Sequence, residues 1–383
     1  MRIAIFDYLV TETNPVGRCH LTLLRRLCDE HEFVVFAVAF DNPRPDRIRF
    51  VRVPAPPRPL ALLFVAFHLL APLALLVARL RGTPRFDCIQ SVESNFGFPG
   101  IAYAHFCHRA YLNAHWKAAR PSGLRRMARW LDHWLHAVAE PSAFRRAKLV
   151  VVPSRGLAAE LSRQYPWVDS KLRILANPVD TGHFTPPADF DRQRARSGHG
   201  YTEDDVVLCF VALGHFERKG LPPLIDAMAR LADRRLRLLV VGGTDATVRD
   251  WTRRVAAAGL AHAVRFAGMQ KDVRPCLWSA DAFVLPSFYE VYPLAGLQAA
   301  AAKLPLIVTA VYGLEEVLRD GENGLLLEPT TDGLARALGR FLALSPAERR
   351  SMGEAAARTV TGCGEEPFAE RWRSLYRQWG ASA

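Results

Sequence analysis

Residues 282–303 read AFVLPSFYEVYPLAGLQAAAAK, and this stretch decides how the fold is interpreted. Its first four residues, 282–285, form a short apolar run typical of a buried strand, and a proline stops the run. Pro293 suits the first position of a helix, because that position has no use for a backbone N–H. Strong helix formers fill Leu294–Lys303. The stretch predicts a strand, a turn that carries Glu290, and a new helix.

The start of this predicted helix is suited to binding an anion. The first N–H groups of a helix have no partner inside it and attract phosphate. A carboxylate beside a phosphate site is a poor phosphate ligand but a good acceptor for sugar hydroxyls. Glu290 next to such a site therefore indicates a nucleotide-sugar. The candidate donor-binding residues at this helix start are Tyr292, Pro293, Leu294 and Ala295.

The composition limits the classes of protein. The chain has 383 residues, half of them hydrophobic, which is enough for two domains with real cores. Seven cysteines occur without a Cys-x-x-Cys pair, which argues for a reducing compartment and against disulfides or a zinc site. Residues 1–6 read as a first strand, and polar residues follow too soon for a signal peptide. We expect a cytoplasmic protein.

The positive charge is concentrated in the first half. Residues 1–180 contain 25 Lys and Arg against 14 Asp and Glu, a net charge of +11, whereas residues 181–383 contain 25 against 24. A one-sided excess points to an anionic partner surface. Anionic lipid is one such partner. Nucleic acid is disfavoured because no recognition motif or aromatic-basic platform is present.

Apolar runs alternate with helical patterns in both halves of the chain. This alternation predicts two doubly wound α/β domains. Residues 174–180, which are rich in turn formers, mark the join between them. The predicted strands are Arg2–Asp7, Glu32–Ala39, Asp87–Val92, Ile101–His105 and Leu149–Pro153 in the first half, and Val206–Leu213, Arg237–Val241, Val264–Phe266, Ala282–Leu285 and Leu306–Thr309 in the second.

Residues 60–78 contain no formal charge, and their length approaches that of a membrane span. Crossing a bilayer would split one sheet, so we consider two alternatives: a buried helix of the first domain, or a helix lying in the membrane surface. The flanking arginines are Arg52, Arg58, Arg79, Arg81 and Arg85. A second basic group, which is either membrane-facing or simply solvated, comprises Lys117, Arg120, Arg125, Arg126 and Arg129, and it precedes an apolar helix with Trp130, Leu131, Trp134, Leu135 and Val138.

Glu290 and Gln298 stand at the two ends of a Glu, seven residues, Glu spacing across the strand, turn and helix. In this respect the chain resembles the retaining glycosyltransferases of family 4, although the second Glu is replaced by Gln. The resemblance implies the GT-B fold, an α/β fold of two Rossmann-like domains facing across a cleft. We place the acceptor-side domain at 1–178, the donor domain at 179–365, and a C-terminal helix returning toward the first domain at 366–383. In the family the second Glu accepts from both ribose hydroxyls, and a Gln accepts more weakly.

The loop Gly214–Gly220 resembles the family loop that binds the donor diphosphate, with Arg218 and Lys219 as its cations. Departure of the leaving group builds negative charge on the diphosphate, which two cations stabilise. By resemblance, the glycine turn at Gly242 and Gly243 borders the nucleotide. The segment around Met269 likewise resembles the family segment whose backbone contacts the base of the nucleotide.

The first domain matches the family less closely. Asn14–Gly17 stands where the family has a glycine-rich loop, so Gly17 is either near the donor phosphate or in an ordinary turn before a helix. By resemblance, His105 reaches the donor sugar's hydroxyls. His108 and His115 lack a third ligand with convincing spacing, and we interpret residues 189–191 (Asp-Phe-Asp) as surface; we expect no metal and no cofactor.

The resemblance implies transfer of a hexose from a nucleotide-diphosphate sugar with retention of configuration. We expect the acceptor to be a lipid-linked glycan or polysaccharide precursor at the cytoplasmic face of the membrane. Two alternatives remain at this stage. One is a partner subunit that binds the nucleotide-sugar without turnover, as Gln298 would permit. The other is a sugar-nucleotide epimerase or a phosphorylase of the same fold, although no lysine for pyridoxal phosphate is evident.

Overall fold

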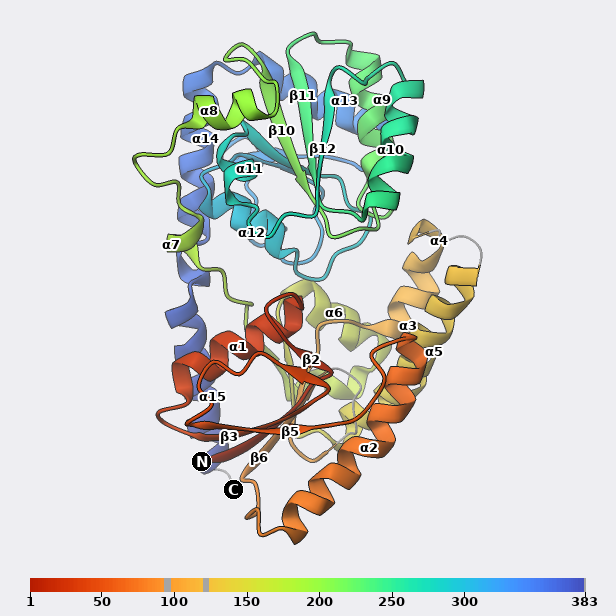
Figure 1. Cartoon of the computed structure of the whole chain (residues 1–383), viewed down its shortest axis with the longest axis vertical. Helices are drawn as coiled ribbons and strands as arrows, with labels where there is room; N and C mark the ends of the chain where they lie inside the picture. Colours follow the sequence, from red (N-terminus) through yellow and green to blue (C-terminus); the bar gives the residue numbers. More distant parts are fainter. Residues whose placement is uncertain (93–97, 120–123, 382–383) are drawn as a thin grey trace. The chain divides into compact units, whose positions relative to one another are not determined.

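The computed structural model of the chain describes residues 1–92, 98–119 and 124–381. The chain divides into two compact units, Met1–Pro178 with Glu365–Ala383 as unit 1, and Val179–Gly364 as unit 2. The join falls inside the predicted linker. The C-terminal segment belongs to unit 1, as drawn in blue beside α1 in Figure 1.

Unit 1 contains a seven-stranded parallel sheet with the order β5-β3-β1-β6-β7-β8-β9 in the described part of the chain. Parallel strands buried on both faces are rich in apolar residues, which is the pattern that the sequence predicts here. The strands are β1 (Arg2–Phe6), β3 (Glu32–Ala37), β5 (Ile48–Arg52), β6 (Cys88–Val92), β7 (Ile101–Tyr103), β8 (Leu149–Val152) and β9 (Leu172–Ile174), and a separate small pair is formed by β2 (Leu9–Val10) and β4 (Ala39–Phe40). The helices are α1 (Pro15–Leu27), α2 (Leu60–Leu80), α3 (His108–Ala110), a π-helix (Tyr111–His115), α4 (Trp116–Ala119), α5 (Leu124–Arg146), α6 (Arg155–Gln164), a 3-10 helix (Pro166–Lys171) and α15 (Glu365–Ala381).

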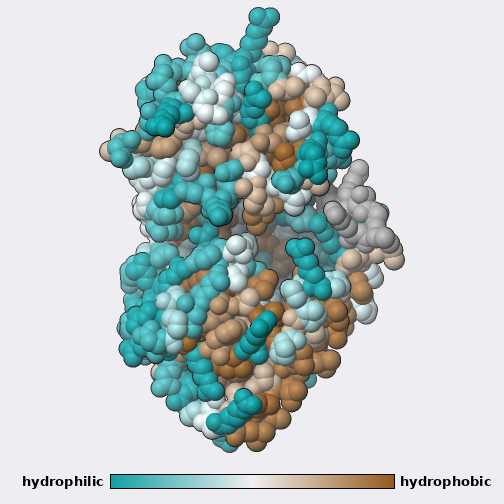
Figure 2. All heavy atoms as spheres, in the orientation of Figure 1, coloured by the Kyte–Doolittle hydropathy of each residue, from teal (hydrophilic) through white to brown (hydrophobic). Residues whose placement is uncertain are grey.

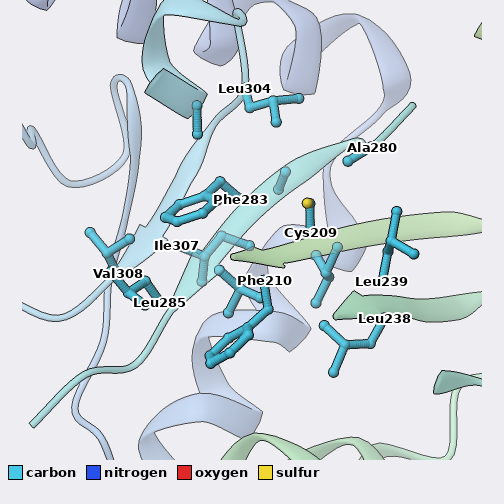
Figure 3. Close-up of a cluster of buried hydrophobic side chains, with 14 of the residues drawn as sticks. Cys209, Phe210, Leu238, Leu239, Ala280, Phe283, Leu285, Leu304, Ile307 and Val308 are labelled. Carbon is cyan, nitrogen blue, oxygen red and sulfur yellow. The ribbon is translucent and has the colours of Figure 1, made fainter. Parts of the chain in front are cut away.

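Unit 2 contains a second parallel sheet, with the order β12-β11-β10-β13-β14-β15. Its strands are β10 (Val206–Val211), β11 (Leu236–Val241), β12 (Val264–Gly268), β13 (Ala282–Leu285), β14 (Leu306–Val308) and β15 (Gly324–Leu326). Its helices are α7 (Thr181–Phe184), α8 (Arg192–Gly198), α9 (Leu221–Leu231), α10 (Asp245–Ala257), α11 (Arg274–Trp278), α12 (Leu294–Ala301), α13 (Thr331–Ala343), α14 (Pro346–Thr359) and a 3-10 helix (Thr361–Cys363). Figure 3 shows part of the core between these layers, where Phe210 of β10 and Phe283 of β13 lie among aliphatic side chains.

Helix α15 completes the core of unit 1. Phe368, Trp372 and Tyr376 are fully buried and recur every four residues, so they form one face that packs into the core shared with α1 and the sheet. The Tyr376 hydroxyl donates to Gln90 Oε1 at 2.7 Å. The predicted boundary at 365/366 is one residue late, because Glu365 already begins α15.

Helix α2 is only partly covered. It contacts β3, β5 and α5, but the most apolar 18-residue stretch of α2 is only 28% buried. Its exposed apolar residues are Leu60, Leu62, Val65, Leu69, Leu73, Leu76, Val77 and Leu80. The alternative of a buried helix of the first domain holds for one face of α2 only, because the described residues leave the other face uncovered. By length and composition α2 also qualifies as a membrane span, the one such helix in the described chain.

Helix α5 extends this exposed apolar area. Met127, Trp130, Leu131, Trp134 and Val138 are all exposed, and the rings of Trp130 and Trp134 stack with centroids 6.2 Å apart. We call the exposed residues of α2 and α5 together the apolar face of unit 1. Figure 2 shows hydrophobic residues gathered over α2 at the lower right. Of the second predicted basic group, Arg120 and the side chain of Arg125 lie outside the described residues.

Histidines line the contact between α2, α3 and α5. His108 Nδ1 lies 2.9 Å from His133 Nδ1, and the His108 and His136 rings stack at 4.2 Å. Phe64 of α2 packs between the His136 ring at 4.4 Å and the His68 ring at 4.0 Å. Burial lowers the pKa of His136 well below its usual value of 6.5, and the three neighbouring histidines act in the same direction. The His136 imidazole between these helices is therefore neutral at neutral pH.

This depressed pKa predicts that α5 becomes less stable in acid. Below about pH 6.5 the unfolded chain binds a proton that the folded chain resists, so stability falls by up to about 1.4 kcal/mol per pH unit and is restored above that pH. Hydrogen exchange of the α5 amides at pH 8 and pH 5.5, corrected for intrinsic rates, measures the change. A His136→Phe variant should show a smaller change in α5 stability with pH, whereas a variant of exposed His262 should behave like the wild type. The same pH dependence in the wild type and both variants would refute the role of His136.

Candidate active site

Two loops at the carboxyl ends of neighbouring strands form the site in unit 2. The loop after β10 carries Arg218 and Lys219, and the turn after β13 carries Glu290. Gly220 joins them, because it has φ of +81° and an added Cβ would lie 2.0 Å from the Pro286 oxygen. The Phe288 N–H also donates to the Arg218 oxygen at 3.0 Å. Glycine at 220 thus brings the two loops into direct backbone contact.

The three predicted charged residues meet at one carboxylate oxygen. Glu290 Oε1 contacts Lys219 Nζ directly and lies 3.2 Å from Arg218 Nη1. The Ser287 hydroxyl donates to the same oxygen at 2.7 Å. The hydrogen bonds and ion pairs of Glu290 within the described chain all use Oε1, which leaves Oε2 for a ligand. Arg218 also donates to the Tyr289 oxygen, so its guanidinium is fixed from two sides.

Burial and pairing set the charge of the cluster. Burial alone would raise the pKa of Glu290, but Lys219 and Arg218 outweigh it and hold that pKa below its usual value. Burial lowers the pKa of Lys219, Arg218 adds to the shift, and Glu290 partly offsets it. Glu290 is therefore ionised. With both cations charged, the cluster carries a net charge of +1. The cationic side chains of Arg218 and Lys219 can therefore bind an incoming anion.

Ser287 and Thr309 support Glu290 and were not predicted. Thr309, which follows β14, donates from its hydroxyl to the Ser287 oxygen at 2.7 Å. This bond fixes the residue whose own hydroxyl holds Glu290. Ser287 could have been predicted, because a Ser three residues before a carboxylate in a turn can bond to it. Thr309 could be found only from the sheet order, which places β14 beside β13. Ser287, Phe288 and Thr309 also line a neighbouring pocket of about 710 Å³ in unit 2.

The helix after the Glu290 turn begins one residue later than predicted. Pro293 is the residue before the first turn of α12, with extended backbone, and the helix runs from Leu294 to Ala301 rather than to Lys303. No side chain caps its start, so the first N–H groups, including those of Leu294 and Ala295, remain for an anion. Gln298 is half-buried on the second turn and makes no side-chain hydrogen bond in the described part of the chain. Tyr292 packs beside Gly313, where a Cβ would meet its ring at 2.6 Å.

The glycine turn after β11 approaches the same strand end. Gly242 has φ of +106°, and an added Cβ would lie 1.9 Å from the Ala212 oxygen. Gly243 packs against the Phe216 ring. Met269 follows β12 and is 54% exposed. Gly214 is half-buried and lies near the start of the loop between β10 and α9. All four lie at the carboxyl edge of the sheet, where ligands of doubly wound sheets bind.

The predicted residues of unit 1 have different outcomes. His105 follows β7 and is held by Asn177, with His105 Nε2 lying 3.1 Å from Asn177 Oδ1. Gly17 is not in a loop: it lies in the first turn of α1, and its N–H donates to the Asn14 cap at 2.8 Å. A Cβ at Gly17 would lie 2.3 Å from the Leu9 oxygen. Gly17 is therefore glycine because α1 packs closely on β2, and its N–H is already used.

Among the residues that the structure describes, no group of three or more His, Cys, Asp or Glu could hold a metal ion. Asp191 of the Asp-Phe-Asp segment is exposed and caps α8 by accepting from the Arg194 N–H at 2.8 Å. This local bond accounts for the presence of Asp191.

Two family models match the chain. Residues 16–183 match "Glycosyltransferase Family 4", and residues 204–343 match "Glycosyl transferases group 1". The first match lies within unit 1 apart from five residues, and the second lies within unit 2.

Curated relatives agree with these matches. An uncharacterized glycosyltransferase of Methanocaldococcus jannaschii is 26% identical over 82% of this chain and 80% of its own length. The lipopolysaccharide core biosynthesis glycosyltransferase LpsE of Rhizobium meliloti is 33% identical over 53% of this chain and 56% of its own length.

Solved structures share the fold over nearly the whole chain. WaaG, a glycosyltransferase involved in lipopolysaccharide biosynthesis, has a TM-score of 0.77 at 18% identity and covers 97% of this chain and 99% of its own. Anabaena HepE in complex with UDP and glucose has a TM-score of 0.74 at 16% identity and covers 99% of this chain and 100% of its own. The family models matched in both halves show that the chain belongs to the group 1 glycosyltransferases of family 4, and its two Rossmann-like units and the solved structures show the GT-B fold.

Proposed function

We propose that the protein transfers a hexose from a nucleotide-diphosphate sugar to a glycan acceptor with retention of configuration. The observation that carries this proposal is the meeting of Arg218, Lys219 and Glu290 at the carboxyl edge of the unit 2 sheet. The cations match a diphosphate, and the carboxylate matches sugar hydroxyls. The UDP and glucose in the HepE structure support a donor of this class.

Arg218 and Lys219 hold the diphosphate in this proposal. As the glycosidic bond breaks, negative charge grows on the leaving phosphate, and two fixed cations stabilise that charge more than the ground state. The uncapped start of α12 adds its N–H groups and dipole. These charges serve where other transferases use a metal ion, so we propose that the reaction is metal-independent.

Glu290 orients the hexose through Oε2 while Oε1 stays anchored by Ser287. The role of His105 rests on the family resemblance alone, since its Nε2 lies 3.1 Å from Asn177 Oδ1 and its Nδ1 is buried. Gln298 accepts a ribose hydroxyl through its amide oxygen, and Gly242, Gly243 and Met269 border the nucleotide. The acceptor hydroxyl attacks from the face that the phosphate leaves, and the leaving phosphate takes the hydroxyl proton. The proposal that the anomeric configuration is retained rests on the resemblance to the family.

Release of nucleotide diphosphate from a panel of UDP-, GDP-, ADP- and dTDP-sugars tests the proposal. Slow donor hydrolysis or transfer that is lost in Glu290→Ala is expected from the purified protein. Binding of a nucleotide-sugar without turnover would instead support the partner-subunit alternative, for which Gln298 is the motivating residue. Interconversion of the sugar without release of nucleotide would support an epimerase.

We further propose that the acceptor is lipid-linked and that unit 1 rests on the cytoplasmic face of a membrane. The apolar face of α2 and α5 carries aliphatic side chains, and Trp130 and Trp134 suit the interface region. Arg52, Arg58, Arg79, Arg81 and Arg85 are all exposed around α2 and match anionic headgroups. The names of LpsE and WaaG, both in lipopolysaccharide biosynthesis, support a lipid-borne glycan as acceptor.

Polar substitution of α2 should weaken membrane binding. The triple variant Leu69→Gln, Leu73→Gln and Leu76→Gln removes three exposed side chains, so flotation with phosphatidylglycerol–phosphatidylcholine vesicles should fall by at least about tenfold. Donor hydrolysis should not change, because unit 2 is untouched.

The matched control is Ala256→Gln with Ala257→Gln, which places the same side chain on exposed positions of α10 in unit 2. The control should float like the wild type. Equal flotation of wild type and triple variant, or no effect of removing phosphatidylglycerol, would rule out the proposed surface.

A further inference from the structure

A pocket of about 710 Å³ lies in unit 2 where β13, β14 and β15 end. Ser287 and Phe288 follow β13, Thr309 follows β14 and Glu328 follows β15, and residues of α13 complete the lining. The volume lies in the range of about 300–1,000 Å³ that is typical of small-ligand sites. The proposed donor site uses the start of α12 instead, so the proposed function leaves this pocket without a role.

Large apolar side chains are exposed in this pocket. Phe288 and Leu326 both line it, and both are exposed to solvent. Exposed apolar side chains that gather in a concave site indicate a ligand with an apolar surface of its own.

The charged groups of the pocket are paired with one another. Arg336 and Arg340 lie one turn apart on α13, and both line the pocket. Arg336 donates to Glu328 Oε2 at 3.3 Å, and Arg340 donates to the two carboxylate oxygens of Asp320 at 3.3 and 3.4 Å. Two guanidinium groups thus balance two carboxylates. All four side chains are exposed, and exposed ion pairs are weak, so a ligand can share or replace these bonds.

This combination fits a neutral sugar better than an anion. An anion that approached either arginine would be repelled by the carboxylate paired with it. Two neighbouring hydroxyls of a sugar ring can instead accept from the guanidinium and donate to the carboxylate at the same time. The C–H face of a pyranose ring is apolar, and it can pack on an aromatic ring such as that of Phe288.

We propose that this pocket is a glycan-binding subsite of unit 2, which holds neutral sugar rings. Ser287 and Thr309 belong both to the pocket lining and to the bonds that hold Glu290, so the subsite adjoins the candidate active site within the same unit. A glycan bound there stays beside the donor-binding unit between transfers. This use rests on the proposed function, whereas the binding itself does not.

Binding of neutral oligosaccharides to the full chain, without any donor, tests the subsite. Arrayed oligosaccharides of glucose, galactose, mannose and rhamnose identify the tightest ligand, and NMR titration measures its affinity. Phe288→Ala should weaken binding by about tenfold, because it removes the stacking ring. Ala310→Trp should weaken it as well, because Ala310 is an exposed residue of the lining and the larger side chain fills the space.

Phe190→Ala is the matched control. It removes a half-buried aromatic ring of unit 2 that packs on Trp278 at 5.0 Å and does not line the pocket, so it should bind the oligosaccharide like the wild type. Unchanged affinity in Phe288→Ala and Ala310→Trp proteins that melt like the wild type would overturn the inference.

The ligand class can fail separately from the site. Binding of no neutral oligosaccharide, or binding only of charged ones with an affinity that falls as salt is added, would refute a neutral ligand. A free monosaccharide that binds as tightly as the oligosaccharide would show a site for a free sugar instead of a glycan. Oligosaccharide binding that Phe288→Ala weakens, in a protein that turns over no donor, would support the subsite and refute the transferase proposal. An active enzyme whose binding is the same in Phe288→Ala would refute only the subsite.

Discussion

Replacing Lys219 with methionine should lower donor turnover by about two to three orders of magnitude, the usual loss when one stabilising charge is removed from a transition state. Lys219 contacts Glu290 and is only 16% exposed, so its charge acts in a partly water-excluded site where electrostatic interactions are strong. The loss should fall mainly on kcat, because charge on the diphosphate grows as the bond breaks. Steady-state assays of donor hydrolysis measure it.

Two controls separate catalysis from folding in this variant. Lys303→Met removes an exposed lysine of unit 2 that is paired with Glu354 at 3.0 Å, and it should leave turnover unchanged. Lys219→Arg should recover part of the activity, because it restores the charge. A Lys219→Met protein that melts like the wild type and keeps its kcat would show that the lysine is a structural partner of Glu290 only.

Glu290→Gln should separate binding of the nucleotide from reaction of the sugar. In the ligand-free protein the carboxylate sits on both cations and competes with an incoming diphosphate. Removing its charge should therefore tighten binding of the nucleotide diphosphate alone by about fivefold to tenfold, or about 1 kcal/mol. The same change removes the charged acceptor for the hexose hydroxyl, so turnover should fall by about a hundredfold.

Calorimetric titration with the nucleotide diphosphate and a donor-hydrolysis assay together measure both effects. Glu354→Gln, an exposed carboxylate of the same unit, is the matched control and should change neither. Weaker binding of the bare nucleotide diphosphate in Glu290→Gln would contradict the competition, and it would mean that Glu290 organises the cations for the ligand.

The sequence predicted the strands that lie inside each sheet better than those at the edges. Strands such as β1 and β13 are continuous apolar runs, because helices cover both faces. In the two large sheets the missed strands are β5, β9 and β15, which all lie at sheet edges, and the small β2–β4 pair was also missed. β5 reads IRFVR, and β15 begins at Gly324, where a Cβ would lie 2.1 Å from the Leu306 oxygen. Close backbone approach, not side-chain pattern, selects that glycine.

The exposure of α2 could not be predicted from the residues of α2 alone. Its composition fits a buried helix, a surface helix or a span equally well. What decides its exposure is that α5, β3 and β5 cover only one side, and α5 is itself apolar on an exposed side. Such coverage depends on residues far away in the chain. For this reason the sequence predicted the apolar segment itself but could not predict how much of it is buried.

In the site, the family spacing brought forward Glu290, Arg218 and Lys219, which the structure places in contact across about 70 residues. The supporting bonds from Ser287 and Thr309 depend on the neighbouring positions of β13 and β14, which spacing does not contain. Gly17 shows the reverse case. A glycine after the first strand suggested a phosphate loop, but its place in α1 is explained by close packing on β2.

The most direct measurement is a structure of the whole chain with a nucleotide-diphosphate sugar that it turns over. We expect diphosphate oxygens within hydrogen-bond distance, about 2.7–3.2 Å, of Arg218 and Lys219, with Glu290 Oε2 on a hexose hydroxyl. A diphosphate bound away from these two cations, or a hexose that does not touch Glu290, would contradict it.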